Sequence, residues 1–160
     1  MGYAEAIQTI DAPIETVWDT LNDIDNTHKW VVGLERAEIT TAGSYGFGTI
    51  YKDFNRIGPM LQVTEWHVTT FEPMSRQVHV SDSAVLPSKM VIVMAARAEG
   101  TRVRMSVEYR FLPKWGIVSR IFERLIMNYV LSNVLRQNLG QLNRYLQSQS
   151  EAQHFISIKA

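Results

Sequence analysis

The sequence has no cysteine among its 160 residues. This absence excludes disulfide bonds, thiolate metal ligands and a cysteine nucleophile. The sequence also lacks an excess of either charge, because sixteen lysines and arginines balance sixteen aspartates and glutamates. Its basic residues form no run longer than a pair. Proteins that bind nucleic acid usually carry clustered positive charge, so we expect no nucleic-acid partner.

Long hydrophobic runs are missing as well. The most apolar region, residues 117–135, is interrupted by Arg120, Glu123, Arg124 and Asn128. The first ten residues are too polar and too short for a signal peptide. We therefore expect no stable membrane insertion and a cytoplasmic location.

The N-terminal part of the chain predicts one strand and two short helices. Residues 3–10 have the pattern of a strand, and Pro13 then fits the first position of a helix. The apolar residues of this helix recur at the spacing of one buried face: Ile14, Val17, Trp18 and Leu21. A second helical turn is expected to end at Trp30.

About six strands are predicted between residues 33 and 112, where turn-forming residues separate strand-like runs. The clearest of them alternates strictly, with Met105 and Tyr109 on one face and Arg104 on the other. Such alternation is typical of an antiparallel strand with one dry and one wet face.

The C-terminal part predicts one long helix. Residues 116–147 contain no proline and only two glycines, Gly116 and Gly140, and they carry a long apolar stripe. A one-faced sheet and an amphipathic helix bury their apolar surfaces when the sheet curls around the helix. We therefore expect a single domain over residues 1–147 and a C-terminal tail over residues 148–160.

Several motifs resemble one known family. They are "IDAPIETVWDTLNDIDNTHKW", "FEPMSR", "EGTRVRMSVEY" and the long last helix. In this order, over residues 3–147, they resemble the polyketide cyclase/dehydrase-like branch of the START/Bet v 1 (SRPBCC) superfamily. The resemblance implies an α+β helix-grip fold, with a curved antiparallel sheet of about seven strands wrapped around a long C-terminal helix and two short helices after the first strand. It also implies a cavity between sheet and helix, usually holding an apolar or aromatic ligand, but it specifies no activity.

The stretch "AGSYGFGTIYK", residues 42–52, is the most glycine-rich part of the sequence. Gly43 and Gly48 have the spacing of a phosphate loop, but Thr49 and Ile50 stand where that loop has lysine and serine or threonine. The next segment is a predicted strand, whereas a phosphate loop leads into a helix. We therefore predict a turn between strands, or a role at the cavity rim, and no nucleotide site.

Few residues are candidates for chemistry. The four histidines lack HExxH or HxH spacing and no acidic cluster completes a ligand set, so we expect no metal and no cofactor. If Val78 and Val80 face inward, His79 faces solvent, although a shift of one register would reverse this.

The third predicted strand carries the only catalytic candidates, Tyr51 and Asp53, which alternate on one of its faces. If that face is inward, Asp53 is a buried acid of raised pKa and a candidate general base. The outward orientation is favoured, because Ile50 and Phe54 then face the core.

Aromatic and sulfur-containing residues are the candidates for a ligand-binding interior. The candidates are Trp30, Trp66, Met94, Met105, Tyr109, Phe111, Phe122, Asn128 and Tyr129. The alternative is that these side chains only fill a solid core. If they line a pocket, Trp30→Ala and Tyr129→Ala should weaken the binding of an apolar probe more than Trp115→Ala does.

Three functions are compatible with these features. The first is the binding or transport of a small hydrophobic molecule, such as a lipid, isoprenoid, quinone or polyketide. The second is a polyketide aromatase/cyclase or dehydratase that uses the same cavity, for which a positioned acid and base are needed. The third is an interaction protein that uses the outer sheet face or the C-terminal tail. Homodimerisation through a strand edge or a helix remains open.

Overall fold

The computed structural model describes residues 1–57, 59–83, 86–110 and 117–159. Its elements follow the predicted order, with one strand, two short helices, six strands and a long helix. They are β1 (Gly2–Ile10), α1 (Ile14–Asn22), the 3-10 helix η1 (Ile24–Lys29), β2 (Leu34–Ile39), β3 (Ile50–Ile57), β4 (Met60–Glu72), β5 (Arg76–Ser81), β6 (Ser88–Arg97), β7 (Gly100–Tyr109) and α2 (Ile117–Lys159).

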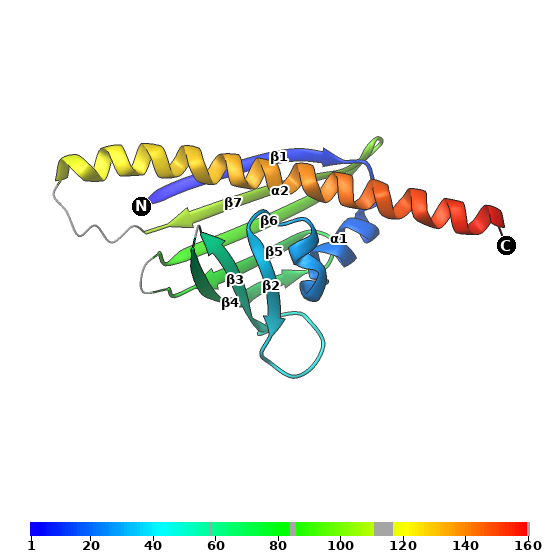
Figure 1. Cartoon of the computed structure of the whole chain (residues 1–160), viewed down its shortest axis with the longest axis horizontal. Coiled ribbons are helices and arrows are strands. Elements are labelled where there is room, and N and C mark those ends of the chain that lie inside the picture. Colours follow the sequence, from blue (N-terminus) through cyan, green and yellow to red (C-terminus); the bar gives the residue numbers. More distant parts are fainter. Residues whose placement is uncertain (58, 84–85, 111–116, 160) are drawn as a thin grey trace.

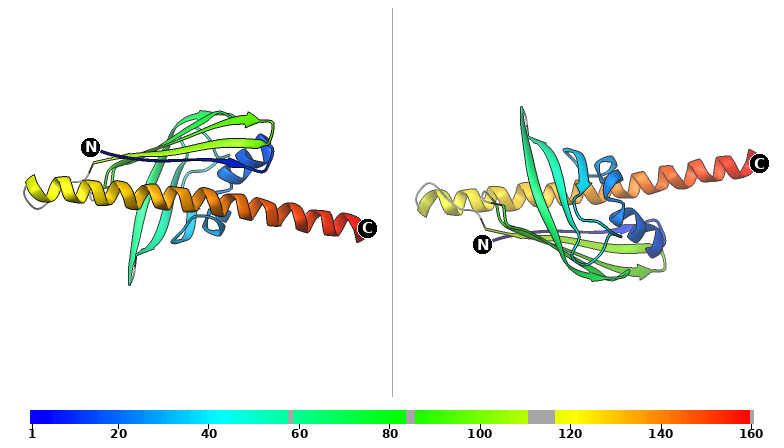
Figure 2. Two further views of the ribbon diagram at one scale, coloured as in Figure 1. Left: turned by 90° about the horizontal axis from the view of Figure 1, so that it is seen from above. Right: turned by 90° about the horizontal axis from the view of Figure 1, so that it is seen from below.

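The seven strands form one antiparallel sheet in the order β1-β7-β6-β5-β4-β3-β2. Strands β2 to β7 are neighbours in chain order, and β1 joins the far edge beside β7. Figure 2 shows that the sheet bends, so that β3 and β4 run across the direction of β1 and β7. The helix α2 lies along β1 (Figure 1). The predicted helix-grip fold is therefore confirmed.

The main core lies between α2 and the inner face of the sheet. The small side chains of Ala4 and Ala6 on β1 let the helix approach this edge closely. Leu135, Leu139 and Leu142 of α2 fill the space above them, together with core residues of β6 and β7. The predicted alternation of β7 is confirmed, since its inward residues are buried or half-buried and its arginines are exposed.

Two features of α2 differ from the prediction. The helix was expected to end near residue 147, but it continues to Lys159 and extends past the sheet (Figure 1). The first part of the expected apolar stripe is not buried either, since Ile126 and Tyr129 are exposed. Only one side of a helix that lies against a sheet edge is covered, and these two residues lie on the open side.

Side-chain amides on α2 fix the loops at both ends of the short helices. Asn143 Oδ1 accepts a hydrogen bond from the backbone N–H of Asp11 at 2.9 Å. Asn138 Oδ1 accepts one from the backbone N–H of Val32, also at 2.9 Å. These contacts hold α1 and η1 over the end of the sheet.

Candidate functional site

The inner face of β5 is polar. Gln77, His79 and Ser81 are 1%, 3% and 1% exposed, and they point to the same side as the core. The antiparallel register pairs His79 with Val68 on β4 and Met90 on β6, which both pack in the interior. The prediction that His79 faces solvent is therefore wrong. It assumed that valines on this strand mark the inner face, whereas here the polar residues do.

Four side chains form a continuous chain of hydrogen bonds across the interior. Tyr51 Oη lies 2.7 Å from His79 Nδ1, and His79 Nε2 lies 3.0 Å from Gln77 Oε1. Gln77 Nε2 donates to Asn22 Oδ1 at 2.6 Å. The chain therefore joins β3 and β5 to the end of α1.

This arrangement fixes the direction of each donor. The amide nitrogen of Gln77 donates to Asn22, so its oxygen accepts from His79 Nε2–H. The neutral imidazole then carries its lone pair on Nδ1, which accepts the hydroxyl proton of Tyr51. The phenolic oxygen of Tyr51 keeps its lone pairs for another donor.

Burial sets the protonation of the histidine and the tyrosine. Desolvation lowers the pKa of His79 to about 4, so the imidazole is neutral at physiological pH. Desolvation also raises the pKa of Tyr51 well above its usual value, and the negative charge of Asp53 and the nearby Tyr45 phenol add to this. Both groups are therefore held in their uncharged forms.

Asp53 also points inward. It pairs with Ala37 of β2, a buried residue, and lies on the same face of β3 as the buried Tyr51. The prediction of an outward Asp53 is therefore wrong. It assumed that Phe54 faces the core, whereas Phe54 lies on the outer face of β3 and is covered there by another side chain. The guanidinium carbon of Arg36 lies 4.0 Å from the centre of the Phe54 ring, and this contact covers the ring at the surface.

The carboxyl group of Asp53 has an unusual environment. Its Oδ1 atom is enclosed and has no hydrogen-bond partner, while the Trp66 side chain donates a hydrogen bond to the carboxyl group. Desolvation raises the pKa of Asp53 to about 7, against the lowering effect of Trp66. A carboxyl group with this pKa can gain or lose a proton near neutral pH.

Tyr45 completes the cluster from the glycine-rich loop between β2 and β3. Gly43 and Gly48 have positive φ angles of 100° and 82°, which lets the loop turn and direct Tyr45 inward. Its ring centre lies 6.3 Å from that of Tyr51 and 5.8 Å from that of Phe71. Its hydroxyl group is enclosed without a partner, and its pKa is raised by burial and by the charge of Asp53. The loop is thus a turn, as predicted, and it also supplies an aromatic wall.

We call Tyr45, Tyr51, Asp53, Trp66 and His79 the polar cluster. The sequence interpretation named Tyr51, Asp53 and Trp66 but missed Tyr45 as a candidate and placed His79 outside. A large aromatic residue between glycines marks this loop, but the signal does not identify Tyr45, because Phe47 has it too and is exposed.

The other predicted lining residues have different environments. Trp30, Met94, Met105 and Tyr109 are buried, and Trp30 Nε1 has no hydrogen-bond partner. Asn128 has a structural role, because its Oδ1 accepts hydrogen bonds from Tyr109 Oη at 2.6 Å and from a backbone N–H of β1.

Tyr129 is 71% exposed, so its prediction as a lining residue is wrong in this structure. Its position on α2 faces away from the sheet, because only one side of the helix is covered there. Phe111 and the side chain of Phe122 lie outside the described residues, as does Trp115, so their predicted places stay predictions.

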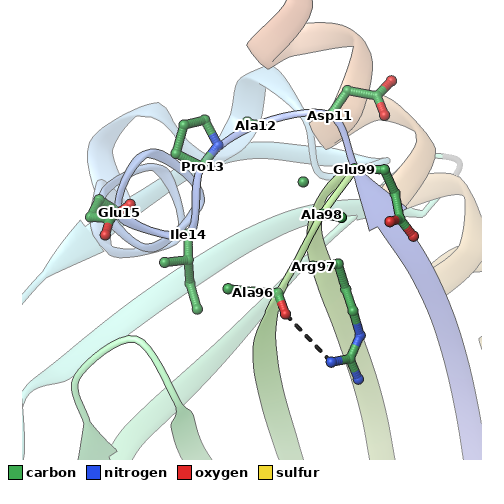
Figure 3. A pocket seen from close by; sticks show the side chains of 10 residues that line it. Asp11, Ala12, Pro13, Ile14, Glu15, Ala96, Arg97, Ala98 and Glu99 are labelled. Carbon is green, nitrogen blue, oxygen red and sulfur yellow. Dashed lines mark hydrogen bonds between the residues drawn. The ribbon is translucent and has the colours of Figure 1, made fainter.

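A surface depression lies away from the polar cluster (Figure 3). It has a volume of about 520 Å³ and is lined by residues 11–15 and 96–100, at the start of α1 and the turn between β6 and β7. It is open to solvent, and the Arg97 guanidinium there is bonded to the Ala96 carbonyl of its own strand. None of the enclosed unpaired atoms belongs to it, so we do not regard it as the functional site.

Two further features bear on function. Among the described residues, no three His, Asp or Glu side chains are grouped so that they could hold a metal ion. In the same part of the chain, no helix combines the length and the apolar character that a membrane crossing requires.

Comparison with known proteins identifies the family. The family described as "Polyketide cyclase / dehydrase and lipid transport" matches residues 2–147 of the chain. The chain belongs to this family. The resemblance predicted from the sequence motifs is thereby confirmed. No curated protein matches the chain.

Solved structures of several other proteins have the same fold as this chain. The protein TTHA0849 from Thermus thermophilus has a TM-score of 0.74 at 16% identity, over 92% of this chain and 99% of that one. SA2116 from Staphylococcus aureus has a TM-score of 0.75 at 8% identity, over 93% and 95%. Ara h 8.0201, a Bet v 1-like protein, has a TM-score of 0.61 at 14% identity, over 88% and 96%. At these identities the likeness establishes the fold alone.

Proposed function

We propose that the chain binds a small, largely apolar molecule on the inner face of the sheet, at the polar cluster. The candidates are a lipid, an isoprenoid, a quinone or a polyketide-like compound. The observation that carries this proposal is that two enclosed polar atoms of the polar cluster have no partners: Tyr45 Oη and Asp53 Oδ1. A buried polar group without a partner costs about 1–3 kcal/mol, so folded proteins rarely retain several together. A bound molecule that offers hydrogen bonds removes this cost.

The surroundings of these atoms fit an apolar ligand. Three members of the polar cluster, Tyr45, Tyr51 and Trp66, are themselves aromatic, and the ring of Phe71 packs against Tyr45. Binding sites for small molecules are mostly apolar and contain a few polar groups that fix the orientation of the ligand. The family description, which includes lipid transport, agrees with this proposal.

The test uses the neutral fluorescent probe N-phenyl-1-naphthylamine. We expect saturable binding with one probe per chain. Tyr45→Ala should weaken the binding about tenfold, because the ring that covers Tyr51 and Phe71 is lost. Phe47→Ala is the matched control, since Phe47 belongs to the same loop but is 79% exposed. Non-saturable binding, or equal weakening by both substitutions, would contradict the proposal.

A second candidate function is acid–base catalysis by the same cluster. It is favoured by one observation, the carboxyl group of Asp53 with a pKa of about 7 beside the hydroxyl groups of Tyr45 and Tyr51. The carboxylate would take a proton from the carbon next to a ketone, the C–H electron pair would form the C=C bond of an enol, and a tyrosine hydroxyl would donate to the ketone oxygen. Aromatase, cyclase and dehydratase reactions on polyketides need proton transfer of this kind.

The catalytic candidate is tested with 1-tetralone in D2O. We expect the protein to accelerate deuterium exchange at the carbon next to the carbonyl group, as followed by NMR. Asp53→Asn should abolish the acceleration, whereas Asp19→Asn, an exposed change on α1, should not. If the wild-type protein does not exceed a buffer blank, this candidate is wrong and the binding proposal is unaffected.

A further inference from the structure

The enclosed groups of the polar cluster constrain the chemistry of the ligand. Asp53 and the two tyrosines come from β3 and from the loop that precedes it, and their side chains converge. The charge of Asp53 acts on both tyrosine hydroxyls, and the two ring centres lie 6.3 Å apart, so the three groups lie in one part of the interior. Neither Tyr45 Oη nor Asp53 Oδ1 has a partner of its own.

The donors and acceptors of these groups differ. Tyr51 uses its proton on His79, so its oxygen can only accept a further hydrogen bond. Tyr45 has a free hydroxyl group, which can donate. Asp53 Oδ1 can accept in either protonation state of the carboxyl group. A ligand hydroxyl can accept from Tyr45 while it donates to Asp53 or Tyr51, so it satisfies both sides of the cluster with one atom.

An anionic group does not fit these surroundings. Where side chains are described, no lysine or arginine is buried, and Lys52 and Lys89, the two that are half-buried, lie on the outer face of the sheet. The one imidazole inside is neutral. A carboxylate or phosphate would therefore be buried without a counter-ion, beside the carboxyl group of Asp53.

We propose that the ligand is a neutral, largely apolar molecule whose polar end is a hydroxyl group, held by Tyr45, Tyr51 and Asp53. This inference rests on the proposed binding function and specifies its ligand class. It separates neutral alcohols and phenols from fatty acids and other anionic amphiphiles, which an apolar interior alone does not distinguish.

Three probes with the same ring system test the inference: naphthalene, 1-naphthol and 1-naphthoate. Their affinities are measured by isothermal titration calorimetry at pH 7.5. We expect 1-naphthol to bind about tenfold more tightly than naphthalene, as two new hydrogen bonds allow, and 1-naphthoate to bind more weakly than naphthalene. Tyr45→Phe and Asp53→Leu should each reduce the preference for 1-naphthol over naphthalene at least threefold.

The control variants keep the chemistry of each substitution but move it to the surface. Tyr129→Phe and Asp19→Leu change exposed side chains and should leave the preference unchanged. If Asp53→Leu does not fold, Tyr45→Phe alone still tests the preference for 1-naphthol, because this substitution removes one oxygen and keeps the ring.

The outcomes separate the two proposals. If 1-naphthol and naphthalene bind equally, or if 1-naphthoate binds most tightly, the inference is wrong and the binding function stands. If the preference for 1-naphthol survives Tyr45→Phe, the hydroxyl group binds elsewhere and the inference is again wrong. If none of the three probes binds while the protein is folded, the binding function fails, and the inference fails with it.

Discussion

Asp53→Asn should change the dependence of stability on pH in a defined direction. The pKa of Asp53 rises from 3.8 to about 7 on folding, because burial disfavours the charged carboxylate. Between these two values the folded state holds a proton that the unfolded state has lost. Stability is therefore lost as the pH rises through this window, and the loss is complete above pH 7.

The magnitude follows from the size of the shift. Each pKa unit corresponds to about 1.4 kcal/mol, so ionisation of Asp53 should lower the free energy of unfolding by about 4 kcal/mol between pH 4 and pH 8. Asparagine cannot ionise. The free energy of unfolding of Asp53→Asn minus that of the wild type should therefore rise by about 4 kcal/mol over this range and then level off.

His79 produces the opposite trend in the wild type. Its pKa falls from 6.5 to about 4 on folding, so stability is lost as the pH falls through this window, by about 3 kcal/mol. The two trends nearly cancel between pH 4.5 and 6.5. In Asp53→Asn only the histidine trend remains, so the stability of this variant should increase with pH. The other titratable groups that face Asp53, Tyr45 and Tyr51, have raised pKa values and do not titrate in this range.

Urea unfolding of both proteins at pH 4.5, 5.5, 6.5 and 7.5 measures the difference directly. The exposed carboxylates are the same in both proteins, so they cancel in the difference. A difference in unfolding free energy that does not vary with pH would show that Asp53 titrates normally and would refute the reasoning. NMR titration of the Asp53 side-chain carbon gives an independent midpoint, which we expect near pH 7.

Three further substitutions test the packing around the site by urea unfolding. Gly100→Ala should destabilise the protein by about 3 kcal/mol or prevent folding, because Gly100 has a φ of 132° and an added Cβ would collide with the carbonyl oxygen of Ile10; a stable variant would contradict this geometry. Leu139→Ala should cost about 3 kcal/mol, since Leu139 is fully buried under the sheet, and a cost below about 1 kcal/mol would mean that the helix does not pack as described. Asn138→Ala should cost about 1–2 kcal/mol, because the backbone N–H of Val32 loses its acceptor, whereas no change would show that water replaces the amide.

The fold could be predicted from the sequence because its large elements follow simple periodicity. The inward residues of β7 alternate with exposed arginines, and the buried leucines of α2 recur every three or four positions. The end of α2 could not be predicted in the same way. Beyond residue 147 the apolar stripe stops, but nothing in the sequence, such as a proline or glycine, ends the helix before Lys159.

The orientation of β3 and β5 could not be predicted, because both strands carry polar residues on their inner faces. On β5 the residues that alternate with the valines, Gln77 and His79, are inside. On β3 the polar Asp53 is inside and Phe54 is outside, where Arg36 covers it. A rule that places apolar residues inward therefore assigns the wrong inner face to both strands. A shift of one residue moves every side chain of a strand to the opposite face.

These two reversed strands carry the residues on which the proposed site depends. Burial of Asp53 and His79 as isolated groups would destabilise the protein, and an aliphatic side chain at either position would pack against the same neighbours at no such cost. His79 is satisfied within the chain, through Tyr51 and Gln77. Asp53 Oδ1 is not, and neither is Tyr45 Oη beside it. In the proposed binding function, a ligand completes the unsatisfied half of the polar cluster, and the hydrogen-bonded half holds Tyr51 in place beside it.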